Sequence, residues 1–227
     1  EGSKEGLIDD LELALKDDRW PAPLDIINGP LMKGMAEVGR LFNANELIVA
    51  EVLQSAEVMK AAVSHLERYM EKKEGSLRGK VLLATVKGDV HDIGKNLVDI
   101  ILTNNGYEVH NLGIKIGIAE MIDKAQEVRA DAIGMSGLLV KSTLIMRDNL
   151  EELNSRELAG IPVLLGGAAL TRSYVERDLR EIYEGRLFYG KDASEGLHVM
   201  DRIGESRRTG EELGDWGLVP SESKVPS

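Results

Sequence analysis

The sequence predicts an α/β protein, in which an N-terminal four-helix bundle is followed by a doubly wound, five-stranded parallel sheet of the flavodoxin or Rossmann-like type. Two observations predict this fold class. Apolar residues recur at helical spacing through residues 3–73. Beyond a charged linker near residues 71–77, apolar runs of strand length alternate with amphipathic helices, which is typical of a parallel sheet with helices on both faces.

Four helices are expected in the first part of the chain, at residues 3–18, 24–28, 31–42 and 47–73. In the first of them, Leu7 and Leu11 fall on one face, and Ser3 is expected to cap the helix start. Proline disrupts a helix interior, so the second helix is expected to stop at Gly29-Pro30. Four helices with short connections predict a small antiparallel bundle.

Five apolar runs in the second part are expected to form strands, at residues 81–86, 107–112, 132–136, 162–165 and 186–189. The helices are expected at residues 94–104, 119–130, 143–154, 173–184 and 193–203. Five strand–helix units predict an open sheet and not an eight-fold barrel. The stretch that follows is polar. The expected organisation is therefore a helical domain at 1–74, an α/β domain at 75–205 and a tail or linker at 206–227.

The composition excludes several classes of protein and site. Lys and Arg number 28 against 39 Asp and Glu, a net charge of −11, which disfavours nucleic acid and membrane surfaces as partners. No apolar run approaches the roughly 20 residues of a membrane helix and no signal sequence is visible, so a cytoplasmic location is expected. There is no Cys, which excludes disulfides and thiolate metal sites, and no zinc is expected.

The loop after the first predicted strand, from Gly88 to Lys95, carries the densest set of polar residues. In parallel sheets of this type, ligands bind at the carboxyl ends of the strands, where the strand order reverses. The loop is not a phosphate-binding loop, because five residues separate Gly88 from Gly94 and Asn96 follows the lysine. A dinucleotide fingerprint is also missing. Both nucleotide-binding interpretations therefore fail.

What remains is His91 between two carboxylates. A neutral imidazole is a good metal ligand, and a carboxylate commonly orients its second nitrogen. Asp89 is the preferred partner, since Asp92 could instead cap the following helix. The alternative is an ordinary loop histidine that satisfies backbone groups. One imidazole cannot hold zinc by itself, so a site with a single His implies a metal that arrives with its own ligands, as in a macrocycle.

Three further strand ends carry candidate residues. Ser142 either extends a His–Asp–Ser hydrogen-bond chain or simply caps its helix. Gly166-Gly167, followed by Ala168, either admits a flat and bulky group close to the backbone or only makes a tight turn. Tyr189 ends the last predicted strand, and Ala193 opens the last helix.

Taken in order, Asp89-x-His91-x-x-Gly94, Ser136-x-Leu138 and Gly166-Gly167 resemble the signature of cobalamin-binding domains that take the cofactor base-off, with His bound to cobalt. The strings 87–96, 136–143 and 164–168 are similar to those of the cobalamin-dependent methionine synthase family. So are residues 30–35 and 55–60 of the helical part. The resemblance covers residues 6–204.

The resemblance implies a role for each matching residue. His91 would be the lower axial ligand of cobalt, and Asp89 and Ser142 would complete a triad that exchanges a proton. Further cofactor contacts are implied for Gly88, Val90, Asp92, Ile93, Gly94 and Val140, the last at a position where the family has a hydroxyl residue. A slot for the displaced nucleotide tail would be lined by Ser136, Leu138, Gly166, Gly167, Ala168, Tyr189 and Ala193.

The resemblance makes the helical part a cap over the upper face of the corrin. Phe42 and Val49 match the positions that shield the methyl group, whereas their spacing alone favours ordinary bundle core. The family has Leu more often at the second position.

The activity implied by the resemblance is methyl transfer from methyltetrahydrofolate to homocysteine, through cob(I)alamin and methylcobalamin. The chain itself lacks both substrate sites. It is therefore expected to be a carrier module of a larger methyltransferase, which docks with the homocysteine, folate and S-adenosylmethionine-binding reactivation domains of the same enzyme. Two alternatives stay open. One is the corrinoid carrier of a methanol or methylamine methyltransferase, and the other is a cobalamin-sensing module without catalysis.

Overall fold

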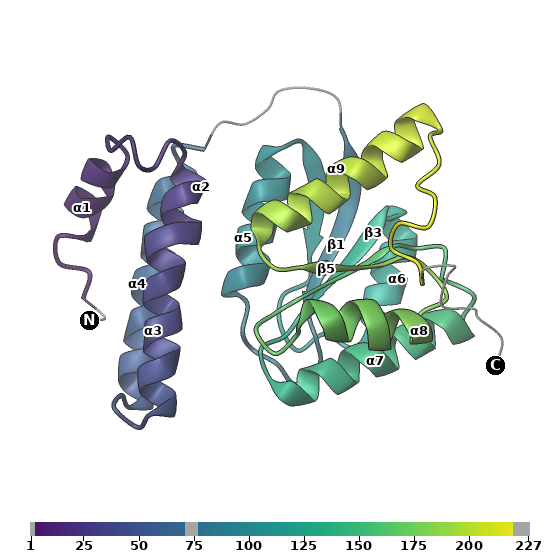
Figure 1. The fold of residues 1–227 in the computed structure, drawn as a ribbon, viewed down its shortest axis with the longest axis horizontal. Helices are drawn as coiled ribbons and strands as arrows, with labels where there is room; N and C mark the ends of the chain where they lie inside the picture. Colours follow the sequence, from purple (N-terminus) through teal and green to yellow (C-terminus); the bar gives the residue numbers. More distant parts are fainter. Residues whose placement is uncertain (1–2, 71–76, 220–227) are drawn as a thin grey trace. The chain divides into compact units, whose positions relative to one another are not determined.

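The computed structural model describes residues 3–70 and 77–219. The chain forms two compact units, Glu1–Glu71 and Lys72–Ser227. The first contains helices and the second a parallel sheet with helices on both faces (Figure 1). Within the described ranges, no helix combines the length and the apolar character that crossing a membrane requires. The predicted α/β fold class is confirmed.

Within residues 3–70, the helical unit contains four α-helical segments and a π-helical segment. They are α1 (Leu7–Ala14), α2 (Pro23–Ile26), η1 (Ile27–Leu31), α3 (Met32–Asn43) and α4 (Val49–Glu67). Helix α4 contacts α1, α2 and α3. Their shared core buries Leu11, Ile26, Ile27, Met59, Ala62, Val63 and Leu66.

Several predicted helix boundaries in this unit are wrong. Helices α1 and α4 end before the expected residues 18 and 73, at Ala14 and Glu67. Pro30 does not end a helix but lies inside η1, which joins α2 and α3 into one continuous helix (Figure 1). Proline lacks an N–H and its ring crowds the preceding turn, and the wider π-helical turn accommodates both effects. Ser3 accepts the Glu5 N–H at 3.1 Å. The helix begins only at Leu7, behind Gly6 in the left-handed conformation.

The sheet has five parallel strands within the described residues. They are β1 (Gly79–Thr85), β2 (Tyr107–Asn111), β3 (Ala132–Ser136), β4 (Val163–Gly166) and β5 (Leu187–Gly190), in the order β2-β1-β3-β4-β5. Strand β1 therefore lies between β2 and β3. Because the chain moves outward in both directions from β1, the carboxyl ends of β1 and β3 flank the point where strand order reverses.

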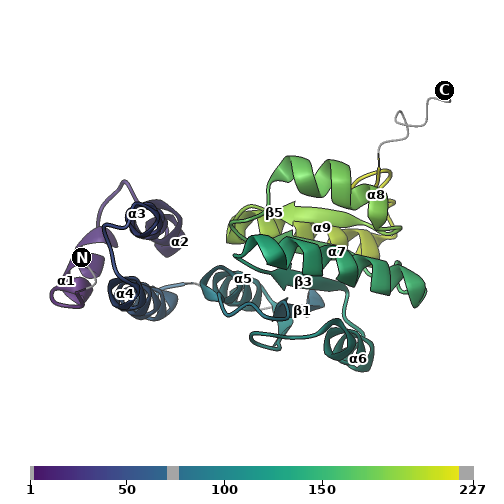
Figure 2. The same cartoon turned by 90° about the horizontal axis from the view of Figure 1, so that it is seen from below.

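Helices cover both faces of this sheet (Figures 1 and 2). They are α5 (Ile93–Asn104), α6 (Ile118–Val128), α7 (Val140–Ser155), η2 (Tyr174–Leu179), α8 (Arg180–Ile182) and α9 (Ala193–Thr209). Leu82 and Ala84 of β1 lie in one core with α6, α7 and η2. Val81 and Leu83 lie in the other core with α5 and α9. The run of consecutive apolar residues in β1 follows from this burial on both faces.

The expected tail from residue 206 is wrong as far as residue 219. Helix α9 continues to Thr209, and the following segment returns to the domain. There, Leu187 N–H donates to the Gly217 carbonyl at 2.8 Å, and the Trp216 ring lies 4.2 Å from the Phe188 ring, centroid to centroid. One tryptophan in a polar stretch supplies enough apolar area to anchor it. Residues 220–227 lie outside the described residues.

Candidate functional site

The predicted site lies at the carboxyl ends of β1 and β3, where strand order reverses. The loop after β1 carries Asp89 and His91, and the start of α7 carries Ser142. Asp89 is fully buried, whereas the His91 side chain is 45% exposed. A buried carboxylate beneath an exposed imidazole is therefore the central feature of this edge.

The two carboxylate oxygens of Asp89 have different partners. Oδ1 lies 2.7 Å from His91 Nδ1 and accepts the His91 backbone N–H at 3.0 Å. Oδ2 accepts the Ser142 hydroxyl at 2.5 Å. It also accepts the backbone N–H groups of Leu138 at 2.8 Å and Leu139 at 3.2 Å. Asp89 thus joins the loop after β1 to the loop after β3.

These contacts determine the charge of Asp89. Burial raises its pKa, but the hydrogen bonds from Ser142, His91 and Leu138 outweigh burial and hold the pKa well below its usual range. An ionised carboxylate only accepts hydrogen bonds. The proton between the two side chains therefore lies on His91 Nδ1, so that Nε2 is the ring nitrogen with a lone pair that a metal could accept.

Asp92 does not compete for His91. It occupies the N-cap position of α5, where it accepts the Asn96 side-chain amide at 3.1 Å. Ser142 lies in the first turn of α7, which begins at Val140 and not at Thr143 as expected. Its hydroxyl donates to Asp89. Of the two interpretations of Ser142, the structure favours the hydrogen-bond chain over the helix cap.

Two glycines let the loops after β3 and β4 approach each other. A Cβ on Gly167, whose φ is 130°, would lie 1.7 Å from the Gly137 carbonyl oxygen. A Cβ on Gly137 would lie 2.6 Å from Ser142 Cβ and 3.1 Å from Asp89 Oδ2. The missing Cβ of Gly167 thus makes room for the Gly137 backbone. The admission of a flat and bulky group, one of the two interpretations of Gly166-Gly167, stays a prediction. Gly137 was not predicted as a site residue, although its position directly after a strand end was the available signal.

Exposed apolar side chains stand around the same edge of the sheet. They follow β1, β2 and β3 or begin α7, and comprise Val90, Ile114, Leu138, Val140 and Leu144. Val140 is the most exposed, at 79%. Large exposed apolar side chains that gather on loops are typical of a binding surface. Sequence reasoning had not named Ile114 or Leu144, because neighbouring apolar residues in the sequence hide them.

The other predicted residues are spread more widely. Gly88 precedes Asp89 with a φ of 80°, and Gly94 lies in the first turn of α5, with Ile93 before it. Ser136 ends β3, and Ala168 follows β4 on the surface. Tyr189 and Ala193 belong to β5 and α9, at the far edge of the sheet from β1. Phe42 and Val49, 41% and 60% exposed, do not belong to the core of the helical unit.

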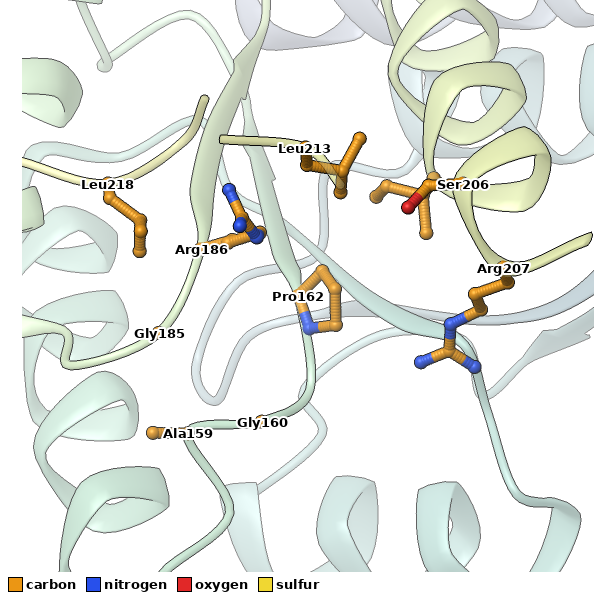
Figure 3. Close-up of a pocket in the computed structure, with 10 residues that line it drawn as sticks. Ala159, Gly160, Pro162, Gly185, Arg186, Ser206, Arg207, Leu213 and Leu218 are labelled. Atoms are coloured by element: carbon orange, nitrogen blue, oxygen red, sulfur yellow. The ribbon is translucent and has the colours of Figure 1, made fainter. Parts of the chain in front are cut away.

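The described residues restrict what a metal at His91 could be. Across 3–70 and 77–219, no three His, Asp or Glu side chains are grouped to hold a metal ion. A metal bound by Nε2 must therefore bring its other ligands. A cavity of about 390 Å³ lies at the opposite edge, among the amino ends of β4 and β5, and includes Pro162, Arg186 and Arg207 (Figure 3). It contains none of the predicted site residues.

Two curated proteins are similar in sequence to this chain. The chain is 57% identical over 214 residues to the methionine synthase of Mycobacterium leprae (strain TN), which covers 92% of the chain and 18% of that protein. It is 57% identical over 210 residues to the methionine synthase of Mycobacterium tuberculosis (strain ATCC 25618 / H37Rv), which covers 92% of the chain and 17% of that protein. The chain spans less than a fifth of these relatives.

Solved structures share the architecture. The monomethylamine corrinoid protein of Methanosarcina barkeri superposes with a TM-score of 0.74 at 26% identity, over 88% of this chain and 91% of that one. The methanol:cobalamin methyltransferase complex of the same organism gives a TM-score of 0.52 at 25% identity, over 90% and 75%. Two family profiles, both described as B12 binding domain, match residues 1–67 and 79–198. The chain therefore belongs to the family of B12 binding domains.

Proposed function

We propose that this chain is the cobalamin-binding, methyl-carrying module of a methionine synthase, and so part of a larger cytoplasmic methyltransferase. The observation that carries the proposal is the Asp89–His91 pair. Its Nδ1 proton is held by a buried carboxylate, which leaves one ligand nitrogen at the sheet's switch point. A single imidazole with apolar side chains around it fits a planar macrocycle that brings its own metal ligands.

His91 Nε2 would hold the cobalt of cobalamin from below, in place of the base of the cofactor. When bound, cobalamin supplies the cobalt that accepts a methyl group and gives it up again. Asp89 keeps the imidazole in one tautomer and one orientation, and its negative charge raises the basicity of the ligand nitrogen. Ser142 donates to the other carboxylate oxygen, which fixes Asp89 independently of His91.

The same three residues would hold a proton when His91 leaves the metal. Nε2 then becomes free to take up a proton from solvent, because the His91 side chain is partly exposed. The ionised Asp89 stabilises the resulting positive charge across the Nδ1 contact. Proton uptake would therefore favour release of the ligand, and proton loss would favour its return.

The remaining predicted residues are assigned by the same proposal. The lower face of the corrin would lie against Gly88, Val90, Asp92, Ile93, Gly94 and Val140. The nucleotide tail would lie along Ser136, Leu138, Gly166, Gly167, Ala168, Tyr189 and Ala193. Phe42 and Val49, exposed on the helical unit, would cover the upper face. We propose domains at 1–74 and from residue 75 onward.

The partners proposed for this module are the homocysteine, folate and S-adenosylmethionine-binding reactivation domains of the same enzyme. Support comes from the relatives, of which this chain covers only 17–18%. A corrinoid carrier of a methylamine methyltransferase is the second candidate, favoured by the TM-score of 0.74. The identity of 57% to methionine synthases, against 26% to that protein, favours the first.

Electron spin resonance of the chain loaded with cob(II)alamin tests the proposal. We expect coupling of the unpaired electron to a ligand nitrogen of His91, and loss of that coupling in His91→Ala. His198→Ala, which removes an exposed histidine of α9, is the matched control and should retain it. Coupling that survives in His91→Ala, or a chain that takes up no cobalamin, would overturn the proposal.

A further inference from the structure

Lys95 is a buried cation that the proposed chemistry does not use. It lies in the first turn of α5 with only 4% of its surface exposed. Burial lowers the pKa of Lys95, while Asp92 and Asp99 act in the opposite direction. A cation in the first turn also opposes the helix dipole. Neither contact with solvent nor stabilisation of α5 explains why a lysine occupies this position. The explanation therefore lies in its hydrogen bonds.

The Lys95 ammonium holds the turn that follows β2. Nζ donates to Asn111 Oδ1 at 2.6 Å and to the Gly113 carbonyl at 3.2 Å. Asn111 Oδ1 also accepts the Gly113 N–H at 3.1 Å. The Asn111 amide in turn donates to Asn96 at 3.1 Å and to Asp99 at 2.8 Å, both on α5. Hydrogen bonds therefore hold residues 111–113 to α5, which begins two residues after His91.

This turn reaches the site through its backbone. The Gly113 carbonyl also accepts the Thr85 N–H of β1 at 2.9 Å. Two residues further on, the Lys115 N–H donates to the Asp89 carbonyl at 3.1 Å. Asp89 is thus held on two sides. The loop after β3 holds its carboxylate, and the loop after β2 holds its main chain.

We propose that Lys95 is a positioning residue for the metal ligand: its buried ammonium fixes the loop after β2, which in turn fixes Asp89 and the orientation of His91. The inference depends on the proposed function, because it concerns the same imidazole. It adds a support that acts from the β2 side, through hydrogen bonds to the backbone and without contact with the metal.

Hydrogen exchange in the chain without cofactor tests the first step. In Lys95→Met we expect the Lys115 amide to exchange about tenfold faster or more, because the loop loses its charge-assisted anchor. Lys124→Met, on the surface of α6, is the matched control and should leave this amide unchanged. An unchanged Lys115 amide in Lys95→Met would overturn the inference.

Spin resonance with cob(II)alamin tests the second step. We expect the fraction of cobalt with nitrogen coupling to fall about twofold or more in Lys95→Met. Asn111→Leu, which removes the acceptor, should act in the same direction, and Lys124→Met should match the unmodified chain. Lys95→Gln gives the same comparison if Lys95→Met is recovered unfolded. Full nitrogen coupling in the folded Lys95 and Asn111 variants would overturn this inference and leave the proposed function standing. Absence of nitrogen coupling in the unmodified chain would overturn the proposed function.

Discussion

At the scale of single residues, Asp89 accepts most of the hydrogen bonds that hold the site together. It accepts from five donor groups on three segments, although its side chain is completely buried. Removing its charge leaves donors aimed at a neutral side chain. Asp89 is thus both a structural connection and the group that determines the tautomer of His91.

Replacing Asp89 by Asn should weaken both functions. We expect the free energy of unfolding to fall by about 1–3 kcal/mol, because an amide N–H₂ would face backbone N–H groups. Nitrogen coupling to cob(II)alamin should fall as well. Urea denaturation and spin resonance measure the two effects. Asp123→Asn, on the exposed side of α6, is the control, and equal stability of the two variants would contradict the prediction.

The low pKa of Asp89 also predicts how stability depends on pH. Hydrogen bonds hold it below the ordinary value of 3.8 in the folded state, despite burial. The stabilisation that ionised Asp89 contributes is therefore complete when the pH is above the pKa of this group in the unfolded chain. It is lost as the pH falls toward the pKa of Asp89 in the folded chain. We expect Asp89→Asn to lose less stability than the unmodified chain when the pH falls from 5 to about 3. Parallel curves for the two chains would contradict this.

The sequence identified Asp89, His91 and Ser142 because they lie at strand ends in a known order. It did not single out Gly137, which lies directly after a strand end, or Lys95. Gly137 matters because a loop from another strand approaches it within van der Waals distance, and Lys95 because its acceptors lie 16 and 18 residues further along the chain. Such contacts exist only after the strands have paired.

At the scale of elements, burial explains which expectations were correct. Strands β1 and β3 are buried on both faces, so each reads as an unbroken apolar run, and their boundaries differ from the expected ones by two residues or fewer. The failures are Pro30 and the segment after residue 205. In both cases the packing of the folded chain outweighs a local sequence signal. A π-helical turn accommodates Pro30, and the contact between Trp216 and Phe188 holds a polar segment against the sheet unit.

Gly167→Ala should be among the most damaging small substitutions in the sheet unit. The new Cβ would overlap the Gly137 carbonyl at a φ of 130°, so the loops after β3 and β4 would have to separate. We expect a loss of about 3 kcal/mol or more in unfolding free energy. Gly160→Ala, where a Cβ meets no described atom within 4 Å, should cost far less. Similar denaturation midpoints for both variants would refute this account.

Truncation distinguishes a tail from a packed segment. A chain that ends at Thr209 loses the Trp216–Phe188 and Trp216–Arg202 ring contacts. We expect it to lose about 2 kcal/mol of stability. A chain that ends at Val219 retains those contacts and should unfold like the full chain. Thermal or chemical denaturation compares them, and equal stability of both truncations would support the original expectation of a tail.

At the scale of the whole molecule, the proposal divides the work between two units. The sheet unit would hold the lower face of the corrin, and the helical unit would cover the upper face. Each unit has a core of its own, as domains that fold independently do. Phe42 and Val49 are exposed on the helical unit as the proposed role requires.

The rate of photolysis of bound methylcobalamin tests whether the helical unit shields the upper face of the corrin. We expect Phe42→Ala to raise the photolysis rate several-fold, because a smaller side chain no longer hinders escape of the methyl radical. Leu13→Ala, which removes an exposed apolar side chain from α1, is the matched control. An unchanged rate in Phe42→Ala would remove the shielding role and leave the assignment of His91 intact.

The segment at 210–219 holds the last described residues of the chain against the sheet unit. Its contacts with Leu187 and Arg186 lie at the amino ends of the strands, across the sheet from His91. A pull applied at Val219 would therefore act on the Trp216 contacts first. Asp89 and His91 lie at the opposite ends of the strands, so the pull would not act on them directly.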